Sequence, residues 1–288
     1  MTGDDRHQCH RDVEIVRCNA ASEFLDTLSP RNEELWGRSV QNWVFRGQAD
    51  ASWPLLSRAE RDPSAFEPYG LVPRKVPIDW SERKRLQEIL LQRFRDELDR
   101  SGIPVPVELP EVGWHDLSWN TGFPPPHARP LLAFAQHHGL PTVMLDWTRH
   151  ARIAAYFAAC SVKEEDRTPS ELAVWALERR EPDGSELAME FCVTPSASNP
   201  NLRAQSGLFT MHMFRDGRRE LPLEDAIASF NATSNDPIGI IKITLDTQHS
   251  RELLYLLADE GVDGASLFPG PDGVVKKLRE TPPIDGIL

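Results

Sequence analysis

The stretch AQHHGLPTVMLDWTRHARIAAYFAA, residues 135–159, decides how this chain folds. A helix ends in its first part, because Gly139 and the Leu-Pro pair after it interrupt a regular helix. The short apolar run of residues 143–145 predicts a strand, and an alanine-rich helix follows from about Ala151. Alanines recur there at three- and four-residue steps, so we expect a sheet to pack closely against that helix.

The polar residues between this strand and this helix form a first candidate site. Asp146 and Thr148 offer side-chain oxygens just before the helix. The first turn of a helix has free backbone N–H groups and a partial positive charge, which suit a phosphate. In the alternative interpretation there is no ligand: Thr148 is a helix cap, and Asp146 bonds the turn backbone.

A second candidate lies upstream, in the segment WVFRGQ of residues 43–48. Its alternation predicts a strand that ends at Arg46, after which Gly47 permits a backbone turn. An arginine at a strand end can hold a phosphate with its planar guanidinium, so Arg46 and Gln48 are expected to bind one. Alternatively, Arg46 pairs with Asp146 without any ligand and fixes how the first strand meets the central helix.

Composition and charge exclude several classes of function. The chain has 288 residues with 32 Lys and Arg against 44 Asp and Glu, a net charge of −12. Without a basic patch in the sequence, nonspecific binding of nucleic acid or of an anionic membrane is not expected. The polar N-terminus and the lack of a long apolar run predict a cytoplasmic protein without a membrane partner. The four cysteines form no CxxC pair and are expected to be reduced thiols.

Strands and helices interleave irregularly along the chain, which favours the α+β class. Residues 1–12 are expected to be a flexible tail, and residues 13–288 a single domain. Residues 195–200 predict a break before a short strand. His137 and His138 end the first central helix, and one of them is expected to face the site. Adjacent residues on a helix point about 100° apart, so the pair is not expected to bind a metal ion.

Together, four stretches resemble the FRG domain family: WVFRGQADASWPLL, the central stretch of residues 135–159, NPNLRAQSGLFT and GVDGASLFPGPDG. They span residues 43–273, most of the chain. The function of this family is poorly defined. The proteins in which such domains occur suggest a role in bacterial defence or as a toxin. Nothing in the residues of this sequence points to that role.

The layout also resembles the ADP-ribosyltransferase superfamily. This resemblance implies a mixed, mostly antiparallel split sheet flanked by helices. It also implies NAD as the ligand and three catalytic positions, Arg46, Asp146 and Gln205. Gln205 takes the place of a late acidic residue in that superfamily. A glutamine can bond a ribose hydroxyl, but it cannot carry the negative charge that stabilises an oxocarbenium-like centre.

The first hypothesis is therefore an enzyme of ADP-ribosyltransferase type that binds NAD or a related nucleotide and acts on a nucleic-acid or protein target. The residues expected to hold the cofactor are Arg46, Gln48, His137, Asp146, Trp147, Thr148 and Tyr156. Arg46 and Gln48 would bind phosphate. Asp146 and Thr148 would orient the ribose, and Tyr156 or Trp147 would stack on a ring.

The second hypothesis is a non-catalytic module that recognises a nucleotide, a nucleic-acid end or a protein partner through the same pocket. A late acidic residue separates the two hypotheses. Asp263 or Asp272 within reach of Arg46 favours the enzyme, and the absence of both from the pocket favours the module.

Overall fold

The structure is a computed structural model that describes residues 7–10, 13–37, 39–62, 64–74, 78–105, 124–162, 170–182, 187–193, 200–214 and 221–282. Most of the expected N-terminal tail, residues 1–6 and 11–12, lies outside these ranges, whereas His7–His10 forms a strand. None of the helices in the described part of the chain has the length and apolar character needed to cross a bilayer. Among the described cysteines, Cys18, Cys160 and Cys192 are free thiols.

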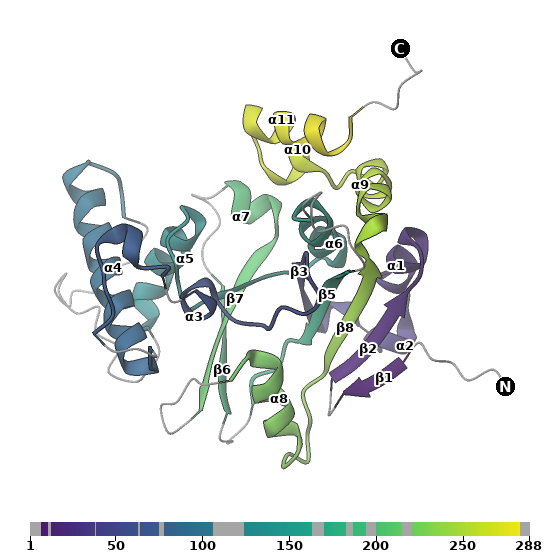
Figure 1. The fold of residues 1–288 in the computed structure, drawn as a ribbon, viewed down its shortest axis with the longest axis horizontal. Coiled ribbons are helices and arrows are strands. Elements are labelled where there is room, and N and C mark those ends of the chain that lie inside the picture. The colour runs from purple at the N-terminus through teal and green to yellow at the C-terminus, as the bar shows by residue number, and fades with distance from the viewer. Residues whose placement is uncertain are drawn as a thin grey trace.

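One mixed sheet of eight strands runs through the protein in the order β1-β2-β8-β5-β3-β4-β7-β6 (Figure 1). The strands are β1 (His7–His10), β2 (Val13–Cys18), β3 (Trp43–Gln48), β4 (Leu145–Thr148), β5 (Glu171–Glu178), β6 (Leu187–Cys192), β7 (Gly207–Phe214) and β8 (Ile240–Asp246). β2 and β8 are parallel, and the other neighbouring strands are antiparallel. The predicted α+β class with a mixed, mostly antiparallel sheet is confirmed.

The sheet is single, so the expected split into two parts is wrong. The closest feature to a split lies between β3 and β4, which are joined by one residue pair, Phe45 with Thr148. By contrast, β3 pairs with β5 over its whole length, from Trp43 to Gln48. We call this place the β3–β4 junction. The single pair keeps the strands in one sheet, although their ladder is short here.

Eleven α-helices lie in the described part of the chain: α1 (Ala21–Thr27), α2 (Glu33–Trp36), α3 (Arg58–Arg61), α4 (Trp80–Arg100), α5 (Arg129–His137), α6 (Ala151–Cys160), α7 (Pro200–Ala204), α8 (Leu223–Asn231), α9 (Ser250–Asp259), α10 (Gly264–Leu267) and α11 (Pro271–Glu280). Short 3₁₀ turns occur at Val40–Asn42, Glu67–Tyr69, Pro126–Ala128 and Thr247–His249.

Three apolar clusters form the core. One joins α1, α6 and α9 to β2, β8, β5 and β3. A second joins α4 and α5 to β6 and β7, and a third packs α8 against the opposite face of the sheet. Register places α5 and α6 on the same face, because Asp146 pairs with Phe209 under α5, and Thr148 pairs with Phe45 under α6. The β3–β4 junction therefore lies between these two helices (Figure 1).

The alanine-rich helix α6 packs against β3, as the small side chains predict. A Cβ added to Gly47 would lie 2.0 Å from the carbonyl oxygen of Ala154 and 2.6 Å from the nitrogen of Ala158. Gly47 lies inside β3, so the expected backbone turn at this glycine is wrong. The physical reason for a glycine here is the close approach of the helix backbone.

β3 extends to Gln48, beyond the expected end at Arg46, and two further element boundaries differ from those expected. The central strand is β4 (Leu145–Thr148), two residues later than residues 143–145. Val143 and Met144 instead fill the apolar cluster under α4 and α5. The other difference is α7, which begins at Pro200, where a break was expected. Proline is favoured in the first turn of a helix, and this short helix has no buried residue, so apolar periodicity gave no sign of it.

Candidate functional site

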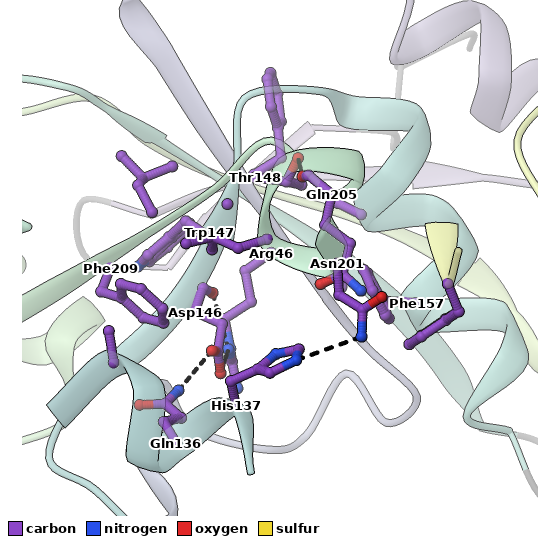
Figure 2. Close-up of a pocket in the computed structure, with 18 of the residues that line it drawn as sticks. Arg46, Gln136, His137, Asp146, Trp147, Thr148, Phe157, Asn201, Gln205 and Phe209 are labelled. Carbon is purple, nitrogen blue, oxygen red and sulfur yellow. Dashed lines mark hydrogen bonds and ion pairs between the residues drawn. The ribbon is translucent and has the colours of Figure 1, made fainter. Parts of the chain in front are cut away.

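A cavity of about 470 Å³ opens at the β3–β4 junction (Figure 2). Its walls come from α5, α6 and α7 and from the strands β3, β4 and β7. Arg46, His137, Asp146, Trp147, Thr148 and Gln205, six of the residues expected at a site, line it. Segments far apart in the sequence meet here because β3 and β4 are neighbours in the sheet.

Arg46 is the central cation of the cavity. Its Nη1 donates a hydrogen bond of 2.9 Å to the backbone carbonyl of Asp146 and lies 3.5 Å from the carboxylate Oδ2 of the same residue. The Arg46 side chain is 14% exposed, and that of Asp146 is 61% exposed. The Nε atom of Arg46 is buried without a hydrogen-bond partner. Burial lowers the pKa of this guanidinium, whereas the Asp146 charge raises it.

A chain of hydrogen bonds orients the Asp146 carboxylate. The hydroxyl of Thr142, which is buried, donates to the side-chain oxygen of Gln136. The amide nitrogen of Gln136 donates in turn to Oδ1 of Asp146 (Figure 2). The Asp146 carboxylate therefore bonds the Gln136 side chain, rather than the turn backbone as the alternative interpretation expected. Asp146 points to the cavity because it alternates with the core residues Leu145 and Trp147 along β4.

Thr148 is occupied by the protein itself. Its hydroxyl donates to the backbone oxygen of Gln205 at 2.8 Å and accepts the N–H of His150 at 3.2 Å. The N-cap residue of α6 is His150 rather than Thr148. Thr148 therefore ties β4 to the residues before β7, next to the start of α6.

The cavity is bridged on one side by His137 of α5 and Asn201 of α7. The Nε2 atom of His137 lies 3.3 Å from the side-chain nitrogen of Asn201 (Figure 2). Burial and the nearby His138 lower the pKa of His137, so the ring is neutral at neutral pH. A neutral imidazole can accept the amide hydrogen of Asn201. His138 instead packs its ring against Phe134, with centroids 4.4 Å apart.

The aromatic wall of the cavity is made by Phe157 and Phe268, with ring centroids 6.1 Å apart at 82°. Trp147 also lines the cavity, but it is buried, and its indole N–H donates to Thr210 at 2.8 Å. Tyr156 is not among the described lining residues; its hydroxyl donates to Glu280 of α11 at 2.8 Å. Tyr156 and Phe157 are adjacent on the helix and so point in different directions, which leaves Phe157 at the cavity.

Gln48 is also absent from the described lining of the cavity. It is buried, accepts a hydrogen bond from the indole of Trp175 at 2.7 Å, and donates to the carbonyl of Pro54 at 3.3 Å. Both the oxygen and the nitrogen of the Gln48 side-chain amide are thus hydrogen-bonded within the protein. Gln205 does line the cavity, but its amide donates to the carbonyl of Leu267 at 3.2 Å.

The two late acidic residues lie elsewhere. Asp263 caps α10 by accepting from Ser266 at 2.9 Å, and it pairs with Lys277 at 2.6 Å. Asp272 belongs to the first turn of α11. Among the described lining residues, Asp146 is the acidic one. No three His, Cys, Asp or Glu side chains of the described chain lie close enough together to hold a metal ion.

Two residues of the site were missed from the sequence. Arg58 and Arg61 of α3 lie with Arg46 around a smaller cavity of about 180 Å³, which we call the arginine pocket. Its lining consists of Arg46, Ser57, Arg58, Arg61, Gln136, Gly139, Leu140, Thr142, Met144 and Asp146. The available signal was the three-residue spacing of Arg58 and Arg61, which places both on one side of a helical turn.

Residues 41–167 match the family model of the FRG domain. This range holds the first two of the four stretches that resemble the family, so the prediction of an FRG domain is confirmed, while the third and fourth stretches lie outside the matched range. No curated protein and no solved structure matches the chain. The resemblance to ADP-ribosyltransferases therefore stays a prediction.

Proposed function

We propose that this chain, which carries an FRG domain at residues 41–167, binds a nucleotide at the β3–β4 junction, with NAD as the first candidate. The observation that carries the proposal is Arg46, a nearly buried cation that lines the cavity and whose Nε has no hydrogen-bond partner. Burying this cation is costly, and an anionic ligand at the guanidinium would offset that cost through charge-assisted hydrogen bonds.

The rest of the cavity supports a ligand that has both a ring and hydroxyl groups. Phe157 and Phe268 offer apolar ring faces, and the exposed Asp146 carboxylate can accept hydrogen bonds from ribose hydroxyls. Asn201 adds a further polar group on the α7 side. The volume of about 470 Å³ falls within the range of small-molecule sites, about 300–1,000 Å³.

The acidic residues favour binding over turnover. Gln205 is uncharged, and its amide is bonded to Leu267, while Asp263 is engaged by Lys277. An enzyme of ADP-ribosyltransferase type would have to use Asp146 for the positive charge that develops on the ribose. Asp146 already faces the cation Arg46, which weakens it for that role. The proposal is therefore a binding module, and we expect no release of nicotinamide from NAD.

Thermal unfolding with and without millimolar NAD tests the proposal. A ligand that binds only the native state raises the unfolding midpoint. We expect a higher midpoint for the wild type and for Arg251→Ala, an exposed arginine on α9, and no shift for Arg46→Ala. A wild type whose midpoint does not move with NAD would overturn the proposal for this nucleotide.

The structural alternative, in which Arg46 serves only to pair with Asp146, predicts a different result. Removing one partner of a buried pair costs about 3–5 kcal/mol. Because the Asp146 side chain is 61% exposed, we expect Arg46→Ala to cost less than about 2 kcal/mol without ligand. A larger loss, together with no NAD shift in the wild type, would favour the purely structural role.

A further inference from the structure

We infer that the arginine pocket holds a phosphate or diphosphate group of the ligand, next to α3. The inference rests on the proposed function for the identity of the rest of the ligand, a nucleotide in the main cavity. Recognition of the phosphate itself rests on the residues of the pocket alone.

The arginine pocket and the main cavity share one wall. Arg46, Gln136 and Asp146 line both of them. A ligand that contacts Arg46 can therefore extend into either space. The volumes of about 180 Å³ and 470 Å³ suit a small charged group beside a larger ringed one.

The charge of the pocket is strongly positive for this protein. Arg46, Arg58 and Arg61 contribute three positive charges to its lining, against the single negative charge of Asp146. The whole chain has a net charge of −12, so this pocket is positive in a protein that is negative on average. The positive charge of Arg61 contributes to lowering the pKa of Arg46, because the two guanidinium groups repel each other. An anion between them would relieve that repulsion.

Local contacts hold α3 in position at the pocket. The N–H of Ser57 donates to the Glu60 carboxylate at 2.8 Å, which closes the first turn of the helix. The N–H of Ala59 donates to the carbonyl of Thr142 at 3.3 Å, and Nη1 of Arg58 donates to the carbonyl of Gly139 at 3.0 Å. These bonds fasten α3 to the turn between α5 and β4. The pocket is therefore built before a ligand binds.

The number and origin of the arginines favour phosphate over carboxylate. A carboxylate offers two oxygens in one plane, which a single guanidinium satisfies. A phosphate offers oxygens in several directions, and here guanidinium groups from β3 and from α3 line one small space. Arg58 keeps one bond to Gly139, so Arg61 is the residue whose removal tests the inference with least effect on the fold.

The test compares Arg61→Gln with the wild type and with the control Arg251→Gln, by calorimetric titration with pyrophosphate, NAD and nicotinamide riboside. Both arginines are exposed on helices, so both substitutions should leave the fold intact. We expect pyrophosphate and NAD to bind Arg61→Gln about tenfold more weakly than the wild type, since one charge-assisted contact is lost. Nicotinamide riboside, which has no phosphate, should bind all three proteins equally.

The outcomes separate this inference from the proposed function. Equal binding of pyrophosphate by the wild type and by Arg61→Gln would overturn the inference. Equal binding of NAD by both proteins would also overturn it and leave the proposed function standing. Pyrophosphate binding that depends on Arg61, in a protein that does not bind NAD, would support the inference and overturn NAD as the nucleotide.

Discussion

Gly47 of β3 and Ala154 of α6 approach so closely that a Cβ on the glycine would lie 2.0 Å from the carbonyl oxygen of the alanine. Both residues line the cavity, so this contact sets the spacing of two of its walls. Arg46 immediately precedes the glycine on β3. The position of the Arg46 guanidinium therefore depends on how α6 packs against β3, although α6 has no charged residue at this contact.

Gly47→Ala is expected to lower the free energy of unfolding by at least about 2 kcal/mol, because backbone atoms of α6 would have to move. Urea denaturation measures the loss. The contrasting variant is Gly207→Ala, whose Cβ would meet the flexible side chain of Leu202 at 2.5 Å. We expect that variant to lose about 1 kcal/mol or less. Equal losses would contradict this explanation of Gly47.

Thr142→Val breaks the hydrogen-bond chain that runs through Gln136 to Asp146. The Gln136 amide then loses the bond that fixes its orientation, so the Asp146 carboxylate is held less firmly. We expect nucleotide affinity to fall several-fold and stability to fall by about 1 kcal/mol. Calorimetric titration measures the affinity. Thr281→Val at the end of α11 is the control and should leave affinity unchanged; the same affinity in both variants would contradict a positioning role.

Tyr156→Phe separates structural from ligand-binding aromatic residues. The variant loses a hydrogen bond to Glu280, which also pairs with Lys276 at 2.7 Å. We expect a loss of about 1–2 kcal/mol in stability with no change in nucleotide affinity. Phe157→Leu should do the reverse and weaken binding, because Phe157 lines the cavity. If Tyr156→Phe weakened binding as much as Phe157→Leu, the sequence-based expectation of Tyr156 at the ring would regain support.

Acid stability depends on Glu82 of α4. Hydrogen bonds from Arg85, at 2.6 Å and 2.8 Å, lower the pKa of this carboxyl from 4.5 to about 2. In the unfolded chain the group takes up a proton as the pH falls below about 4.5, and in the folded chain only near pH 2. Its contribution to stability is therefore complete above pH 4.5 and is lost progressively toward pH 2.

Denaturation of the wild type and of Glu82→Gln between pH 2 and pH 7 measures this contribution. The side chain of Glu82 is 6% exposed, so its ion pair is well shielded from solvent. We expect the wild type to be more stable than Glu82→Gln above pH 4.5 and the difference to shrink as the pH falls toward 2. A difference that stays constant with pH would contradict the lowered pKa.

The central part of the site could be predicted because it is local in the sequence. The alanine spacing of residues 151–159 required a close partner, and the structure supplies β3. Asp146 and Thr148 come just before a recognisable helix, and Arg46 belongs to a recognisable apolar strand. These three residues meet at the cavity because their strands are neighbours.

The remaining residues depend on directions that the sequence does not determine. Gln48 lies two residues beyond Arg46, but the packing of Trp175 occupies its side chain. The choice between Tyr156 and Phe157 depends on the rotation of α6 about its axis, which is set by tertiary contacts with β3 and α11. Arg58 and Arg61 are exposed, so no apolar pattern marks them, and only the docking of α3 beside the α5–β4 turn brings them to Arg46.

The single residue pair between β3 and β4 has a dynamic consequence. In a regular strand pair, a backbone N–H of the neighbouring strand would donate to the Asp146 carbonyl. Here the Arg46 side chain donates that hydrogen bond instead. In the sheet order, five strands end at β3 and three begin at β4. Within the described part of the sheet, the two groups are joined by one backbone pair and by the hydrogen bond from the Arg46 guanidinium. A ligand that binds Arg46 and Asp146 at the same time would add a further link between β3 and β4. Ligand binding in the cavity should therefore slow amide hydrogen exchange in β4 and also in its neighbour β7, which pairs with β4 along its whole length.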